Sequence, residues 1–241
     1  MLDPSLFYWI LVPMALVGGF ARGFAGFGGP LLMVPVLNLF LPPATTVALI
    51  LWIDLFVNVR LLPDARRHAS KDVILPLSLG AALAIPVGAW VLITTDPTTM
   101  KKAIAATILV AALFLLTGWR YRKSIRPPVY GAVGLLAGFV MGSTSIASVT
   151  PLFLSAGNRT ASENRANFIV WVFFATVLIL LLLGFRGTLE QKDIIAIAVL
   201  AVFYLVGTEA GTRFHYRVDE KIVRRTVLGM VIVAAVAGLA L

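Results

Sequence analysis

A glycine-rich stretch near the beginning of the chain holds residues suited to binding an anion. Residues 18–30 read GGFARGFAGFGGP, and six of these 13 residues are glycine. Each glycine weakens a helix by about 1 kcal/mol relative to alanine, whereas Pro30 fits the first turn of a new helix. We therefore predict a helix that stops and restarts, with free N–H groups and a positive helix end facing one point. The candidate ligands in this stretch are Arg22, Gly26, Gly28 and Gly29.

Two interpretations of this stretch differ in what the glycines do. Arg22 would hold an oxyanion through a planar contact with two hydrogen bonds. The alternative is close helix packing through small residues, which Gly19 and Gly23 alone would fit. The denser sequence GFGGP at 26–30 favours the break.

A hydroxyl-rich stretch, MGSTSIASVTP at 141–151, is the counterpart in the second half of the chain. Hydroxyl groups donate hydrogen bonds to an anion and cap a restarted helix, but in a continuous helix they bond their own backbone. Both interpretations stay open for each hydroxyl. The sequence SENRANF at 162–168 adds an arginine that is either a second anion contact or a surface residue. The candidates here are Ser143, Thr144, Ser145 and Arg165.

Ionisable residues within apolar segments form a third group of candidates, because burying them is costly. Asp54 lies in LWIDLFVNVR with Asn58 one turn later, and Glu209 lies in YLVGTEAGTRF. Asp54 and Glu209 are candidates for proton exchange, and with Asn58 they form a candidate ion-coupling set. The alternative is a structural ion pair, such as Glu209 with Arg213, or a side chain that reaches the interface.

The composition excludes several other kinds of site. The chain has no cysteine, and its two histidines lie in charged loops without the spacing of a metal site. No nucleotide-binding, serine-hydrolase or zinc-protease motif occurs. We therefore expect no cofactor, no metal and no enzymatic activity.

The elements that position these residues are membrane helices. The chain is 60% hydrophobic and 13% charged, and uncharged runs such as 23–53 and 127–158 exceed the roughly 20 residues that span a bilayer. We predict an all-α membrane protein with about eight segments in two inverted-topology repeats, each beginning with a broken or re-entrant Gly/Ser-rich helix. The expected helices are 5–21, 43–62, 73–94, 102–119, 129–157 (broken), 166–185, 194–213 and 222–241.

The two halves look related. Gly19 and Gly23 match Gly134 and Gly138 with the same offset of 115 residues, and Gly88 matches Gly211 with an offset of 123. The predicted division is a first repeat at 1–119, a basic cytoplasmic linker at 120–128 and a second repeat at 129–241.

Basic residues predict the orientation. Three links, 60–72, 119–128 and 213–225, hold 13 of the 20 Lys and Arg residues and are placed inside. The links at 95–102, 158–165 and 186–193 are then expected outside or within the membrane. This arrangement requires segment 127–158 to dip in and return, or to cross twice, which is typical of inverted repeats in secondary transporters.

The first-half motif resembles a known family. GFAGFGGPLLMVPVL (23–37) is followed by LPP (41–43), LPLSLGAALAIPVGAWV (75–91) and later ENRANF (163–168). Essentially the whole chain resembles the TauE/SafE family, the sulfite exporter or 4-toluene sulfonate uptake permease family. The resemblance implies passage of sulfite, sulfoacetate or other sulfonates, by secondary transport. Many members read GIGGPP-like in the second half, where this chain reads GSTSIASVTP (142–151).

The expected function is therefore secondary transport, and export in particular, of a small sulfur-containing anion. Alternating access would take place around a midplane site in a multi-pass protein of the cell (inner) membrane. The alternatives are a non-transporting membrane scaffold or assembly factor and an intramembrane enzyme. The expected partners are the anionic substrate, the lipid bilayer and, as an open alternative, a second copy of the chain as a homodimer. Nucleic acid is not expected.

Overall fold

The computed structural model describes residues 7–25, 28–117, 127–154, 157, 159–184, 193–215, 229, 231–233 and 235–236. The regular structure in these residues is helical throughout, which confirms the predicted all-α class. The elements are η1 (Phe7–Leu11), α2 (Val12–Ala25), α3 (Gly29–Leu37), α4 (Pro43–His68), α5 (Lys71–Thr94), α6 (Pro97–Thr117), α7 (Pro127–Thr144), α8 (Val149–Leu154), α9 (Ala161–Gly184) and α10 (Asp193–His215).

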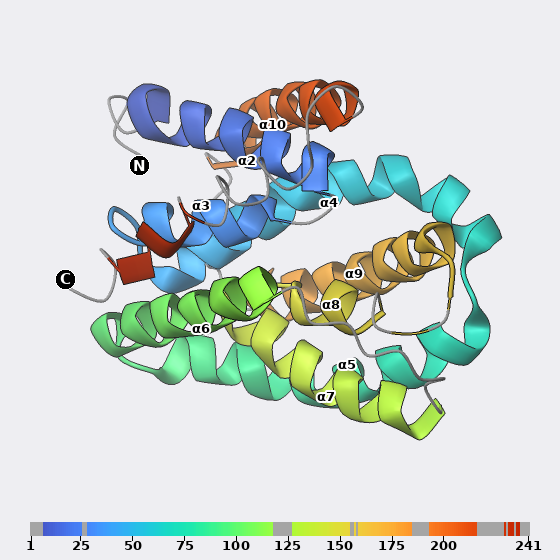
Figure 1. Ribbon diagram of the computed structural model, residues 1–241. Coiled ribbons are helices and arrows are strands. Elements are labelled where there is room, and N and C mark those ends of the chain that lie inside the picture. The colour runs from blue at the N-terminus through green and yellow to red at the C-terminus, as the bar shows by residue number, and fades with distance from the viewer. Residues whose placement is uncertain are drawn as a thin grey trace.

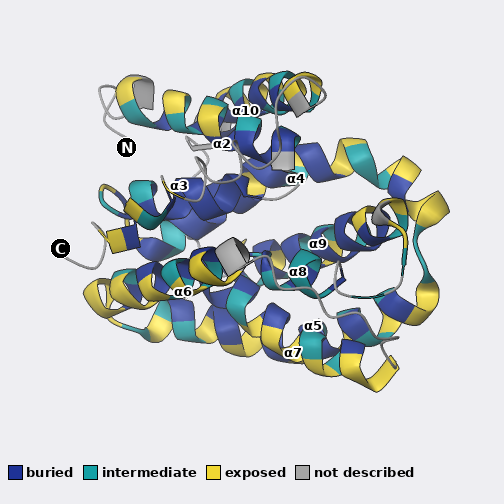
Figure 2. Ribbon diagram, in the orientation of Figure 1, coloured by how far each residue is buried: buried dark blue, intermediate teal, exposed yellow. Residues whose placement is uncertain are grey.

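Five of the described helices, α4, α5, α6, α9 and α10, are long and apolar enough to cross a membrane. A shorter apolar helix covers 9–24. Exposed residues follow the outer faces of the helices, as Figure 2 shows, and many of them are large and apolar, such as Leu83 and Trp90, which are 72% and 57% exposed. Such exposure suits lipid rather than water. The expected helix at 222–241 and the linker at 120–128 lie largely outside the described residues.

Both predicted breaks are present, and each makes a hairpin. After α2, the chain turns at Gly28 with a φ of 121°, and α3 returns along α2, so that a Cβ at Gly18 would lie 2.5 Å from Met33 Sδ. After α7, Ser145 has a φ of 59° and α8 returns, with the rings of Tyr130 and Phe153 edge to face at 6.3 Å. A left-handed φ is unusual for a residue with a Cβ, so Ser145 marks a tightly determined turn.

The helices pair across the two halves of the chain. In Figure 1, α2 lies beside α10 and α5 lies beside α7, with α4 and α9 between the two pairs. A Cβ at Gly23 would lie 1.9 Å from the Thr208 carbonyl oxygen, and one at Gly134 would lie 2.2 Å from that of Leu77. Only glycine permits such close backbones. The small-residue interpretation of Gly19 and Gly23 is thus confirmed, alongside the break at Gly28.

One predicted link position is wrong. The Arg159 side chain donates to Ser70 Oγ at 2.8 Å and pairs with Asp72, so the link at 158–165 lies on the same side as the basic link at 63–72. The hairpin of α7 and α8 therefore enters and leaves from that side. The charge count misplaced this link because two arginines, Arg159 and Arg165, weigh little against the larger basic clusters.

Candidate functional site

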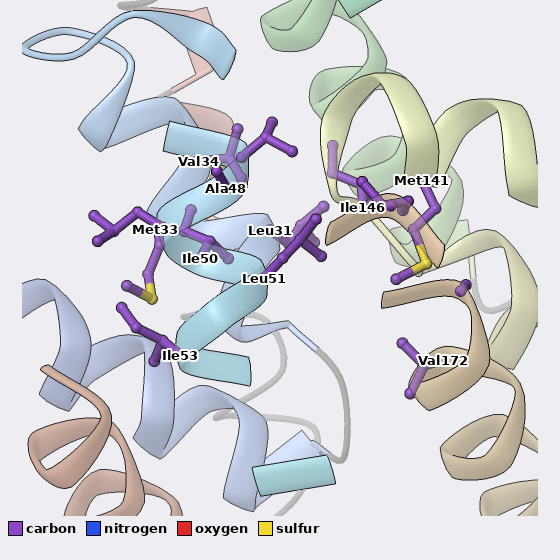
Figure 3. Packing of buried hydrophobic residues seen from close by; sticks show 14 of the residues in the cluster. Leu31, Met33, Val34, Ala48, Ile50, Leu51, Ile53, Met141, Ile146 and Val172 are labelled. Atoms are coloured by element: carbon purple, nitrogen blue, oxygen red, sulfur yellow. The ribbon is translucent and has the colours of Figure 1, made fainter. Parts of the chain in front are cut away.

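A small closed cavity lies where the two breaks meet. Its volume is about 10 Å³, room for about one water molecule. Figure 3 shows Leu31 and Leu51 on one side of this region and Met141 and Val172 on the other. The described residues that line it are Arg22, Gly28, Pro30, Leu31, Leu51, Asp54, Met141, Ser145, Ile146, Ala147, Ser148, Phe168 and Val172.

A buried network of four polar side chains joins the first break to α4 and α10. Arg22 donates from Nη2 to Asn58 Oδ1 at 2.7 Å, and its Nε lies 3.1 Å from Asp54 Oδ1, an ion-pair contact without a hydrogen-bond angle. Asp54 also accepts from Asn58 Nδ2 at 3.1 Å and from the Tyr204 hydroxyl at 3.0 Å. None of the four side chains is more than 4% exposed. The Arg22 charge is therefore neutralised by Asp54 in this closed conformation.

Local structure explains why these side chains converge. Arg22 lies in the last turn of α2, at the helix end beside the break. Asp54 and Asn58 are four residues apart on α4 and so share one face of that helix. Tyr204, which we did not single out from the sequence, reaches them from α10 because Gly29 leaves room: a Cβ there would lie 2.1 Å from the Tyr204 hydroxyl oxygen. The only sequence signal for Tyr204 was its place in an apolar helix, because a buried phenol hydroxyl needs a hydrogen-bond partner.

The first break has the predicted form of a helix start. Gly28 precedes α3 and lines the cavity together with Pro30. No side chain caps the first turn of α3. The predicted ligands differ in position, because Gly28 faces the cavity whereas Gly29 packs on Tyr204. Gly26 lies outside the described residues.

The hydroxyls of the second break divide into two groups. Ser143 Oγ donates to the Phe139 carbonyl at 2.8 Å and Thr144 Oγ1 to the Val140 carbonyl at 2.6 Å, so both bond their own helix. Ser145 and Ser148 line the cavity, and their buried Oγ atoms have no hydrogen-bond partner among the described residues. A buried unpaired hydroxyl costs free energy. Thr150 Oγ1 is also buried and unpaired but Thr150 does not line the cavity, so the hydroxyls of Ser145 and Ser148 are the ones placed to offer hydrogen bonds to a ligand there.

Two predicted residues lie away from the cavity. Arg165 is exposed on α9. Glu209 is exposed on α10, where it lies 3.2 Å from Arg213 Nε and 3.9 Å from Arg60 Nη2. The structure therefore confirms the ion-pair interpretation of Glu209, with Arg213 as its partner.

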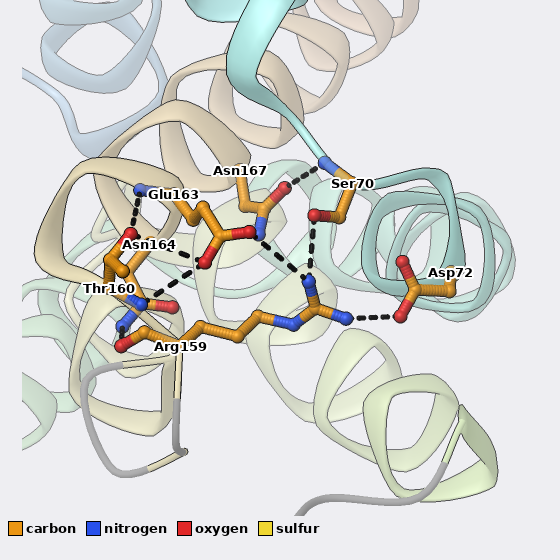
Figure 4. A network of polar contacts seen from close by, with 7 residues as sticks. All are labelled: Ser70, Asp72, Arg159, Thr160, Glu163, Asn164 and Asn167. Carbon is orange, nitrogen blue, oxygen red and sulfur yellow. Dashed lines mark hydrogen bonds and ion pairs between the residues drawn. The ribbon is translucent and has the colours of Figure 1, made fainter.

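A second polar cluster joins α9 to the link between α4 and α5 (Figure 4). Arg159 contacts Ser70 and Asp72, and Asn167 Oδ1 accepts from the Ser70 backbone N–H at 2.7 Å. Thr160 and Glu163 bond each other's backbone N–H groups at the start of α9, a reciprocal cap. The cluster fixes the two links to each other on one side of the protein.

The described part of the chain contains no group of three side chains able to hold a metal ion. Its helices, the two hairpins and the closed cavity define a multi-pass membrane protein with a polar site between broken helices. Residues 11–238 match the family Sulfite exporter TauE/SafE, and the chain belongs to this family of membrane transporters, which is not an enzyme family. Comparison with curated proteins and with solved structures gives no match.

Proposed function

We propose that the protein is a secondary transporter, working as an exporter, of a small sulfur-containing anion such as sulfite, sulfoacetate or another organosulfonate. The observation that carries this proposal is the convergence of Arg22 with two unpaired buried hydroxyls, Ser145 and Ser148, on one cavity between the breaks. An oxyanion takes hydrogen bonds from exactly such donors. Membership of the sulfite exporter family agrees with the substrate class.

The two halves, 1–119 and 129–241 around the linker at 120–128, are proposed to be inverted repeats. The packing supports this relation. Gly80 of α5 meets the Gly131 carbonyl just as Gly207 of α10 meets the Leu16 carbonyl. Residues 16 and 131 are separated by the interval that separates Gly19 from Gly134. The first long helix of each half thus pairs with a helix of the other half, α2 with α10 and α7 with α5, an arrangement suited to rocking motions.

Asp54 is proposed to couple transport to protons. In this structure the Asp54 carboxylate is paired with Arg22, the cation that an incoming anion needs. A proton on Asp54 would remove that competition and leave Arg22 to the substrate, while Asn58 and Tyr204 keep their bonds to the carboxyl group. Asp54 lines the cavity whereas Glu209 is not among the lining residues, so we assign coupling to Asp54 rather than to Glu209.

Alternating access is proposed to open the closed cavity on one side at a time. The Arg159 cluster joins the two links on the inner side, so opening there between α5 and α9 requires those contacts to break. Each chain holds both breaks, so the carrier is complete as a single chain and in a homodimer would have one site per chain.

The test is flux in proteoliposomes loaded with sulfite, sulfoacetate, sulfate or acetate. We expect saturable flux of a sulfur anion, with a raised KM in the folded variant Arg22→Lys, because lysine keeps the charge but loses the two-pronged contact. Flux with an unchanged KM in that variant would move the site elsewhere. Protein that is folded but carries none of the anions would refute the transport proposal and favour a scaffold.

A further inference from the structure

A surface groove between α4 and α9 is independent of the cavity at the breaks. Its volume is about 380 Å³. The lining is apolar except at one end, where Arg66 is the single charged residue. The described residues that form the groove are Leu62, Arg66, Val170, Phe173, Phe174, Val177, Leu178 and Leu181.

The length of the groove matches one leaflet of a bilayer. From Val170 to Leu181, α9 rises about 16 Å at roughly 1.5 Å per residue. The hydrocarbon core of a bilayer is about 30 Å thick, so the apolar lining runs about half of that depth. An extended acyl chain from one leaflet therefore fits along it.

The charge at the end of the groove is unpaired. Arg66 lies in the last turn of α4, and no hydrogen bond or ion pair joins its guanidinium to another described residue. By contrast, Arg159 on the same side of the protein is committed to Ser70 and Asp72. Arg66 lies in the basic segment at 60–72, which the positive-inside rule places at the cytoplasmic surface.

We propose that this groove binds an anionic phospholipid of the cytoplasmic leaflet, with its phosphate on Arg66 and one acyl chain along Phe173, Val177 and Leu181. A guanidinium binds phosphate through two parallel hydrogen bonds, and basic pockets between membrane helices on this side suit anionic head groups. Because α4 and α9 come from different halves of the chain, the bound lipid bridges the halves and stabilises their contact.

The test uses the purified full-length protein in detergent, with phosphatidylglycerol or phosphatidylcholine added. Bound lipid is counted by native mass spectrometry, and the thermal midpoint of unfolding is measured in parallel. We expect phosphatidylglycerol to bind and raise the midpoint in wild type. Arg66→Gln should weaken that binding about tenfold or more, as loss of a hydrogen bond to a charged group does. The matched control, Arg67→Gln, removes the same charge one residue later, outside the groove lining, and should behave as wild type.

A second variant tests the apolar part of the groove. Val177→Trp fills it without removing the charge and should also lose phosphatidylglycerol while leaving the oligomeric state of the protein unchanged. Equal binding of the two lipids by wild type, or wild-type binding by Arg66→Gln, would overturn the proposal. A change in oligomeric mass in Val177→Trp, with lipid binding intact, would instead assign the groove to a second copy of the chain.

Discussion

The two helix breaks meet at one cavity but satisfy their polar groups in opposite ways. The first break brings a full charge, Arg22, and surrounds it with Asp54 and Asn58. The second brings no charge, and the hydroxyls of its two cavity-lining serines, Ser145 and Ser148, have no partner among the described residues. Removing one partner of a buried ion pair is strongly destabilising, whereas an unpaired buried hydroxyl itself weakens the fold and retains its capacity for a ligand. Variants at the two breaks should therefore separate stability from substrate affinity.

The largest effect is expected from Arg22→Gln. It leaves Asp54 as a buried carboxylate without its cation, which typically costs about 3–5 kcal/mol. The double variant with Asp54→Asn removes both charges and should recover much of that loss. Unfolding in detergent with a chemical denaturant measures both. If the single variant were as stable as wild type, the pair would not hold the first break together.

A smaller loss, about 1–3 kcal/mol from overpacking, is expected from Gly29→Ala. The added Cβ would lie 2.1 Å from the Tyr204 hydroxyl oxygen and push the phenol away from Asp54. Tyr204→Phe should restore part of the stability in the Gly29→Ala background. It should do nothing for Gly28→Ala, where the added Cβ meets no atom within 4 Å and the φ of 121° is the only source of strain. Rescue of both variants alike would rule out the steric explanation.

Asp54→Asn tests the role of the Arg22–Asp54 pair at the first break in transport. On the proposal that a proton on Asp54 leaves Arg22 to the anion, wild-type flux should rise as the pH falls. The asparagine variant cannot titrate at this position, and its flux should lose this dependence. Initial rates in proteoliposomes over a range of pH provide the comparison. The same pH profile in both proteins would remove Asp54 from the coupling mechanism.

The smallest effect is expected at the inner cluster. Arg159→Gln breaks contacts to Ser70 and Asp72, and such partly exposed pairs contribute roughly 1 kcal/mol or less. Arg165→Gln is the matched control, because Arg165 is exposed on the same helix end and away from the cavity. The first variant should shift the midpoint of thermal unfolding slightly and the second should not. A raised KM for substrate in Arg165→Gln alone would restore that residue as an anion contact.

Sequence patterns predicted the features that depend on local composition. The helical class, the glycine-rich break and the pairing of Asp54 with Asn58 one turn later all follow from short-range patterns. Whether a hydroxyl bonds its own helix depends on the residue at which the helix ends. Because α7 ends at Thr144, the hydroxyls of Ser143 and Thr144 bond the backbone and those of Ser145 and Ser148 do not. Such boundaries are not predictable to one residue.

These short-range patterns do not predict contacts between residues that are far apart in the sequence. Tyr204 bonds Asp54 across 150 residues, and that contact exists only because α10 packs against α2 through glycines. The position of Arg159 beside the link between α4 and α5 depends likewise on its ion pair with Asp72. Neither contact leaves a spacing signal in the sequence.

The central claim, that the unpaired hydroxyls of the second break bind the transported anion, is tested most directly by the KM of the transported sulfur anion in proteoliposomes. Wild type is compared with the double variant Ser145→Ala/Ser148→Ala and with Ser78→Ala, whose hydroxyl is also buried and unpaired but does not line the cavity. We predict a KM raised about tenfold in the double variant, equivalent to about 1.4 kcal/mol, with an unfolding midpoint no lower than that of wild type, and a wild-type KM in Ser78→Ala. A wild-type KM in the double variant would contradict the account.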